Sequence, residues 1–214
     1  MLDPLGSTSW HHRHLVHFQR LNELLVGEAI GLPTILIVGP GGVSRWASPF
    51  LNDAADEDAS RIRRLVGDAA RYSDHLLRRI PRMPLSSLEP IELTRALTMP
   101  HELVVADRSQ RVLAAVARDL PRATCHCVDI SFQPLPVTAD VVVAFNVVCR
   151  LEARADRGMA AVAAAVRPGG WLLIDDRSAA AHLADRQEFV RVGSKTYRRG
   201  AERGGAVLVG DGPR

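Results

Sequence analysis

Short apolar runs alternate with amphipathic segments along most of this chain of 214 residues. The apolar runs, rich in β-branched residues, predict strands over 34–38, 102–106, 124–128, 139–145 and 171–174. Apolar positions three or four residues apart predict helices over 10–30, 89–98, 109–118, 152–166 and 178–185. Strand-like segments follow near 188–197 and 205–209. Strands that alternate with helices predict an α/β fold with a doubly wound, mostly parallel sheet.

The same pattern predicts a single domain over 1–214, with an N-terminal helical cap at 1–33 that Gly31 and Pro33 end. A long, mostly helical stretch separates the first two predicted strands. We assign 47–99 to a helical insertion after the first strand. Because it would leave the sheet at the carboxyl end of that strand, we expect it to form a lid over a ligand site or a surface for a partner.

Composition narrows the class of protein. Hydrophobic residues make up 47% of the chain and charged residues 24%, which is ordinary for a globular domain. No apolar run approaches the roughly 20 residues that span a bilayer, and the N-terminus shows no secretion signal. Three cysteines are too few for a disulfide framework and fit a reducing compartment. We therefore expect a cytoplasmic protein without a membrane partner.

Two clusters contain residue types that bind metals. Cys125 and Cys127 flank His126, but they fall on a predicted strand and no second cluster follows at zinc spacing, so we predict buried cysteines and no metal site. His14 and His17 lie three positions apart on the first predicted helix. We favour a role in the core or on the surface for this helix, and contact with a substrate or cofactor stays open.

The glycines after the first strand carry most of the functional information. Gly39, Gly41 and Gly42 have no Cβ, so the backbone can turn sharply and a ligand can approach its N–H groups. Four further segments follow in order. Two of them, 104–109 and 127–130, contain an acidic residue after a strand, 140–146 ends in an asparagine, and 167–174 contains a Pro-Gly-Gly turn. Together these segments resemble the core of the class I S-adenosylmethionine-dependent methyltransferases over 34–176.

This resemblance implies a Rossmann-like fold, S-adenosylmethionine as cofactor, and a set of binding residues. The set comprises Gly39, Pro40, Gly41, Gly42, Asp107, Arg108, Asp129, Ile130 and Asn146. Asp107 would bind the ribose hydroxyls, Asp129 would accept from the adenine amine, and Asn146 would face the reacting centre. A dinucleotide fingerprint places its acidic residue about 20 positions after the glycines. Asp107 follows Gly39 by 68 positions, which is why we treat 47–99 as inserted.

The resemblance implies an enzyme of the methyltransferase class that methylates an oxygen, nitrogen or carbon of a small molecule. His75, His101 and His12 are the candidate bases for a nucleophile that carries a proton. One alternative is an RNA methyltransferase that uses the basic C-terminal residues Arg191, Lys195, Arg198, Arg199 and Arg203.

Two further functions stay compatible with the sequence. A nicotinamide-dependent oxidoreductase would use a similar glycine turn. A non-catalytic, methyltransferase-like binding protein also fits, because Ile37 stands where the family places an acidic residue and Val43 where it places a third glycine. Nothing in the pattern decides between a monomer and a homodimer.

Overall fold

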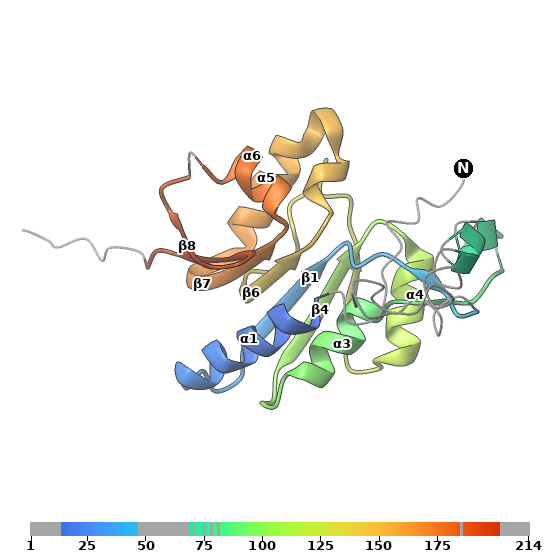
Figure 1. The fold of residues 1–214 in the computed structure, drawn as a ribbon, viewed down its shortest axis with the longest axis horizontal. Helices are drawn as coiled ribbons and strands as arrows, with labels where there is room; N and C mark the ends of the chain where they lie inside the picture. Colours follow the sequence, from blue (N-terminus) through green and yellow to red (C-terminus); the bar gives the residue numbers. More distant parts are fainter. Residues whose placement is uncertain are drawn as a thin grey trace, which may run out of the picture.

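The computed structural model describes residues 14–46, 69–70, 72–74, 76–77, 79–80, 82–184 and 186–201. It has the predicted α/β architecture, with a seven-stranded sheet in the order β5-β4-β1-β6-β7-β9-β8 (Figure 1). The strands are β1 Thr34–Val38, β4 Glu102–Asp107, β5 Thr124–Cys127, β6 Ala139–Ala144, β7 Val166–Ile174, β8 Phe189–Gly193 and β9 Thr196–Arg199. The helices are α1 Leu15–Gly27, α3 Leu88–Ala96, α4 Gln110–Asp119, α5 Ala155–Ala165 and α6 Asp176–His182, with the 3-10 turns η2 Val148–Arg150 and η3 Glu152–Arg154.

Both faces of the sheet are covered, which explains the continuous apolar runs. In β1, Ile35 and Ile37 pack on one side with residues of α1, α3 and α4. Leu36 and Val38 pack on the other side with residues of α5 and α6. Figure 1 shows the same layers, with α1 and α3 on one side of the strands and α5 and α6 on the other. Among the described residues, no helix is both long and apolar enough to cross a membrane.

The first five strands of the sheet order are parallel, so their carboxyl ends share one edge. The chain runs outward from β1 in one direction to β4 and β5, and in the other to β6 and β7. Such a reversal of strand order is where α/β sheets bind their ligands. β9 is antiparallel to β7, so the amino end of β9 also lies at this edge.

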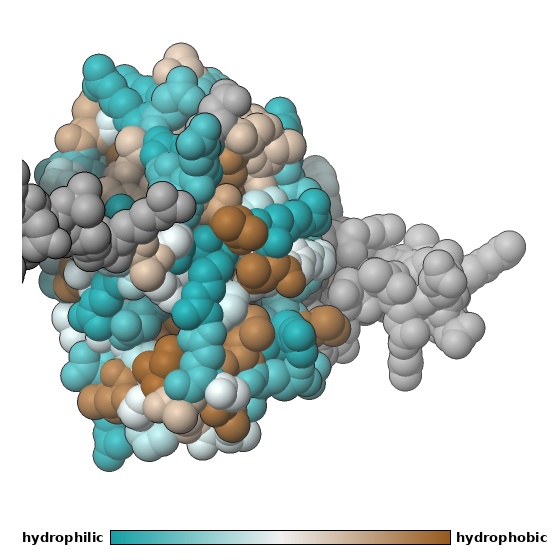
Figure 2. All heavy atoms as spheres, turned by 90° about the vertical axis from the view of Figure 1, so that its left-hand side faces the viewer, coloured by the Kyte–Doolittle hydropathy of each residue, from teal (hydrophilic) through white to brown (hydrophobic). Residues whose placement is uncertain are grey.

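The end of the sheet differs from the sequence prediction. We expected one strand near 188–197 and another near 205–209, but β8 and β9 form a hairpin within 189–199. The turn uses Lys195 at φ 55, a left-handed conformation that its residue type did not signal. Residues 205–209 lie outside the described residues. Figure 2 shows the side of the molecule that lies at the left of Figure 1, where hydrophobic and hydrophilic side chains are interspersed.

The cysteine prediction is wrong for one residue. Cys125 is half-buried against the helix side of the sheet, and burial raises the pKa of its thiol. Cys127 is exposed, at the end of the edge strand β5. The sequence pattern did not reveal that this strand lies at the edge of the sheet.

The Pro-Gly-Gly segment lies inside β7, where we expected a turn before the strand. Ala139 pairs with Val166 and Val141 with Trp171, so β7 has extra residues relative to β6 and forms a bulge. Gly169 in the bulge has φ 76, which glycine adopts without strain. The bulge lets β7 continue as a buried central strand.

Gly170→Ala should destabilise the fold by about 1–3 kcal/mol, the usual cost of overpacking. An added Cβ would lie 2.8 Å from the Asp140 carbonyl oxygen and 2.9 Å from that of Arg167, and backbone atoms cannot move aside easily. Urea unfolding would measure the loss. Gly193→Ala is the matched control, because its Cβ would meet only Thr196 Cβ at 3.8 Å. Equal stability of the two variants would contradict this account of the bulge.

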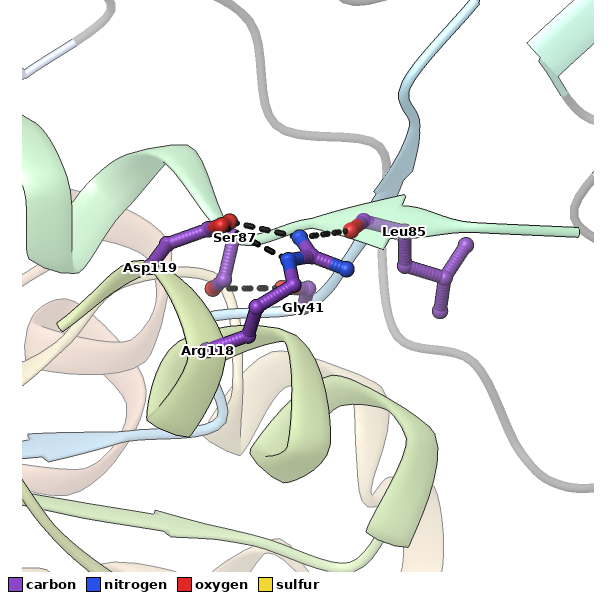
Figure 3. A network of polar contacts seen from close by, with 5 residues as sticks. All are labelled: Gly41, Leu85, Ser87, Arg118 and Asp119. Atoms are coloured by element: carbon purple, nitrogen blue, oxygen red, sulfur yellow. Dashed lines mark hydrogen bonds and ion pairs between the residues drawn. The ribbon is translucent and has the colours of Figure 1, made fainter. Parts of the chain in front are cut away.

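The return of the insertion packs against the glycine loop and α4. β2 (Val43–Ser44) pairs with β3 (Leu85–Ser86), and the Ser44 amide donates to Asp74 at 2.6 Å. Figure 3 shows Ser87 donating to the Gly41 carbonyl, while Arg118 of α4 donates to the Leu85 carbonyl. These contacts fix the loop after β1 against the returning insertion and α4.

Candidate functional site

A pocket opens at the carboxyl edge of the sheet, at the reversal of strand order. It is formed by the ends of β1, β4, β5 and β6 and the turns that follow them. Its lining comprises Val38, Gly39, Ala106, Asp107, Arg108, Val128, Asp129, Ile130, Asn146, Val147, Arg150 and Leu151. Six of the nine predicted cofactor residues therefore meet here, although they come from four separate parts of the sequence.

Gly39 is the glycine that faces this pocket. It has φ 59, and its amide donates to the Ala106 carbonyl at 2.7 Å, which ties the end of β1 to β4. Val147 from the turn after β6 packs directly on its Cα, so that a Cβ at Gly39 would overlap Val147 Cγ2. The absence of a side chain thus lets three strand ends approach one another.

The other predicted loop residues do not line the pocket. Pro40, Gly41 and Gly42 are buried, and the Gly41 carbonyl accepts from Ser87. Gly42 faces α4 and β3, where a Cβ would lie 3.1 Å from Val112 Cγ2 and 3.3 Å from a Leu85 methyl. These residues pack against β3 and α4, on the side of the loop away from the pocket. The glycine pattern in the sequence could not reveal this contact, because β3 comes from the insertion.

Asp107 ends β4 at the wall of the pocket and is only 6% exposed. Its Oδ1 accepts from the Ser109 amide at 2.7 Å, and the Ser109 hydroxyl in turn caps α4 by accepting from Val112. The carboxylate is therefore held in one orientation at the start of the helix. A rigid carboxylate beside a pocket is a strong acceptor for hydroxyl donors.

Asp129 follows β5, which lies next to β4. Burial alone would raise the pKa of Asp129, but two hydrogen bonds from Ser131 and the charges of Arg108 and Arg154 outweigh it and hold that pKa below its usual range. The Ser131 amide and hydroxyl both donate to Oδ1, at 2.9 and 2.6 Å. The side chain is thus ionised at neutral pH. Ile130 beside it is an apolar wall of the same pocket.

Asn146 lies in the turn after β6 with φ 55, the left-handed conformation that asparagine tolerates better than most residues. Its amide donates to Asp175 Oδ2 at 3.0 Å, and Asp175 also accepts from the amide and hydroxyl of Ser178. The Cys149 amide donates to the Ser178 hydroxyl at 3.2 Å. This network fixes the turn that brings Val147 to Gly39.

Sequence analysis did not identify Asp175 or the pocket residues of this turn, Val147, Arg150 and Leu151. Val147 and Val148 resume the apolar run of β6 after Asn146, so that periodicity alone gave no sign of a turn. The available signal was Asn146 itself, a residue type that favours the left-handed conformation at the end of a strand.

Of the three candidate bases, the structure describes only His101. His101 precedes β4 and therefore lies at the amino edge of the sheet, roughly 20 Å from Asp107 by the rise of a strand, where its Nδ1 contacts the Met99 carbonyl at 3.0 Å. It is too far away to act on a ligand in the pocket. His75 and His12 lie outside the described residues, as does the first part of the insertion, 47–68. None of the described residues of the insertion lines the pocket.

We compared the sequence with models of known protein families. Residues 90–174 match the model of a methyltransferase domain. This part of the chain is thus similar to methyltransferase domains. The matched segment runs from α3 to the end of β7 and includes Asp107, Asp129 and Asn146. No curated protein sequence matches the chain significantly.

Comparison with solved structures finds a shared fold in one methyltransferase and weaker likeness in two others. N-methyltransferase NodS from Bradyrhizobium japonicum, in complex with S-adenosyl-L-homocysteine, has a TM-score of 0.50 at 13% identity, over 87% of this chain and 85% of that one. CalS10, an amino pentose methyltransferase from Micromonospora echinaspora, has a TM-score of 0.41 at 19% identity, over 78% of this chain and 51% of that one. A TehB-like methyltransferase from Corynebacterium glutamicum has a TM-score of 0.44 at 14% identity, over 83% and 84%. This chain thus spans about half the length of CalS10.

Proposed function

We propose that this chain binds S-adenosylmethionine in the carboxyl-edge pocket and transfers its methyl group to an oxygen, nitrogen or carbon of a small molecule. The observation that carries the proposal is the meeting of Gly39, Asp107, Asp129 and Asn146 in one pocket. They come from the ends of four strands, in the order that the family resemblance implies. The family match supports the methyl-transfer chemistry.

The residues present fit the chemistry of this cofactor. Asp107 and Asp129 offer carboxylate oxygens to the ribose hydroxyls and the adenine amine, which are donors. Val128, Ile130 and Leu151 supply apolar surface for the adenine ring. Gly39 leaves backbone exposed beside Asn146 for the amino-acid part. When bound, S-adenosylmethionine supplies an activated methyl group, so the protein mainly has to orient donor and acceptor.

The basic C-terminal residues give little support to methylation of RNA. Arg198 pairs with Glu28 and stacks 4.2 Å from the centroid of the Trp171 ring. Arg199 donates to the carbonyls of Ala163 and Val166. Both guanidinium groups thus contact groups of this chain itself, which leaves less positive charge for a phosphate backbone.

The oxidoreductase and the non-catalytic binding protein are also less well supported. The antiparallel β9 departs from the parallel strand order 3-2-1-4-5-6 of nicotinamide-binding domains. The hypothesis of a non-catalytic binding protein rests on Ile37 and Val43. Both are fully buried, Ile37 in the core and Val43 in the β2 region. Neither residue lines the pocket, so neither substitution removes a group from it.

Calorimetry with S-adenosylmethionine, S-adenosylhomocysteine and NAD should distinguish these functions. We expect both adenosyl ligands to bind with dissociation constants between about 1 µM and 1 mM, a range common for enzymes and their substrates. We expect no heat of binding with NAD. Binding of NAD alone would favour the oxidoreductase, and binding of none of the three would contradict the proposed function.

A further inference from the structure

The first turn of α1 places two histidines at the carboxyl edge of the sheet. The His14 ring stacks on Phe145 at a centroid distance of 4.0 Å and an interplanar angle of 16°. The His17 ring lies 5.8 Å from the same Phe145 ring. Phe145 directly follows β6 and directly precedes Asn146 of the pocket. The two histidines therefore lie at the carboxyl edge beside the residue that precedes Asn146, and neither of them lines the pocket itself.

This side is opposite to the two aspartates. Asp107 and Asp129 end β4 and β5, on one side of β1, whereas β6 lies on the other side. If Asp107 and Asp129 held the ribose and adenine, Gly39 and Asn146 would be the pocket residues left for the reacting end of the cofactor. The acceptor of the methyl group then approaches from the β6 and β7 side, where α1 lies.

Charged groups from two other elements surround His17. Lys195 lies in the turn between β8 and β9, and Asp176 begins α6. Arg191 of β8 contacts Asp176 at 3.4 Å and offsets part of its charge. His17 itself is half-buried, so it is accessible from one side and shielded on the other. His14, on the same helix, is 4% exposed and packs in the core below it.

We propose that His17 is the proton acceptor of the methyl-transfer reaction and faces the acceptor molecule beside Asn146. This inference rests on the proposed function. An oxygen or nitrogen of the acceptor forms the bond to the methyl carbon, the carbon–sulfur bond breaks, and its electron pair stays on sulfur. The proton of the acceptor atom goes to the free imidazole nitrogen of His17.

The environment keeps His17 in the accepting form. Burial lowers the pKa of His17, the positive charge of Lys195 lowers it further, and the negative charge of Asp176 opposes them without reversing the shift. The imidazole is therefore neutral at neutral pH. A sulfonium nearby lowers the pKa again, because it adds a like charge. Methyl transfer turns the sulfonium into a neutral thioether, so the affinity of His17 for a proton rises as the proton arrives.

NMR titration of the histidine ring protons tests this without a known acceptor. The pKa of His17, assigned with the His17→Asn variant, is measured with saturating S-adenosylmethionine and with saturating S-adenosylhomocysteine. We expect it to be lower with S-adenosylmethionine by about half a pH unit or more, the effect of one charge within roughly 8 Å. His101 at the amino edge is the internal control and should give the same pKa with both ligands.

The outcomes separate the two proposals. Calorimetry on the same samples shows whether both ligands bind. If both bind and the pKa of His17 is the same with each, His17 is not beside the reacting centre and this inference is wrong, while the proposed function stands. An equal shift of His17 and His101 overturns it as well. If neither ligand binds, the proposed function fails and the inference with it.

Discussion

Gly39→Ala should abolish detectable binding of S-adenosylmethionine and destabilise the fold by about 2–4 kcal/mol. Two effects add. Gly39 has φ 59, which costs an L-residue roughly 1–2 kcal/mol. The new Cβ would also overlap Val147 Cγ2, which displaces the turn after β6 and with it Asn146. Calorimetry and urea unfolding measure the two losses separately.

A double-mutant cycle identifies the cause. Val147→Ala removes the methyl group that Gly39→Ala would strike, so the double variant should be at least about 1 kcal/mol more stable than the sum of the single changes predicts. Gly27→Ala is the control for a glycine without such neighbours, because no atom lies within 4 Å of its Cβ position. Additive single changes would show that Val147 does not pack on Gly39.

Asp107→Asn should weaken S-adenosylmethionine binding by about 1.5–3 kcal/mol, which is roughly tenfold to 150-fold, as expected when hydrogen bonds to a charged group are lost. Asparagine keeps an oxygen that can accept from the Ser109 amide, so the start of α4 should stay intact. The loss of affinity then measures what the negative charge of Asp107 contributes to binding of the ribose hydroxyls. Calorimetry gives the affinity, and circular dichroism confirms the fold.

Glu102→Gln is the matched control for this change. Glu102 begins β4 at the amino edge, where its carboxylate accepts from the Thr34 hydroxyl at 3.3 Å. The substitution neutralises a carboxylate on the same strand as Asp107. Since this carboxylate lies roughly 17–20 Å from the pocket by the rise of a strand, the affinity for S-adenosylmethionine should not change. Undiminished affinity in Asp107→Asn, with the fold intact, would remove Asp107 from the site.

Much of the fold could be predicted from residue patterns alone. The strand at 34–38 and the helix at 109–118 agree with β1 and α4 within a residue, because their apolar periodicity decides their type. The acidic residues at the ends of β4 and β5 could be found for the same reason, since parallel strands bring their carboxyl ends to one edge. Local signals failed at the β8–β9 turn and at the bulge of β7, where φ values depend on neighbouring strands.

The sequence by itself determined the class of fold and the two carboxylates at strand ends, because these follow from periodicity and from residue types at strand ends. Only the tertiary structure decided which glycine faces the pocket, since this depends on Val147 against Gly39 and on Leu85 behind Gly42. It likewise placed His101 at the far edge of the sheet and His17 beside Phe145. Positions distant in the sequence meet through strand order and helix packing, and neither is encoded in a local pattern of residues.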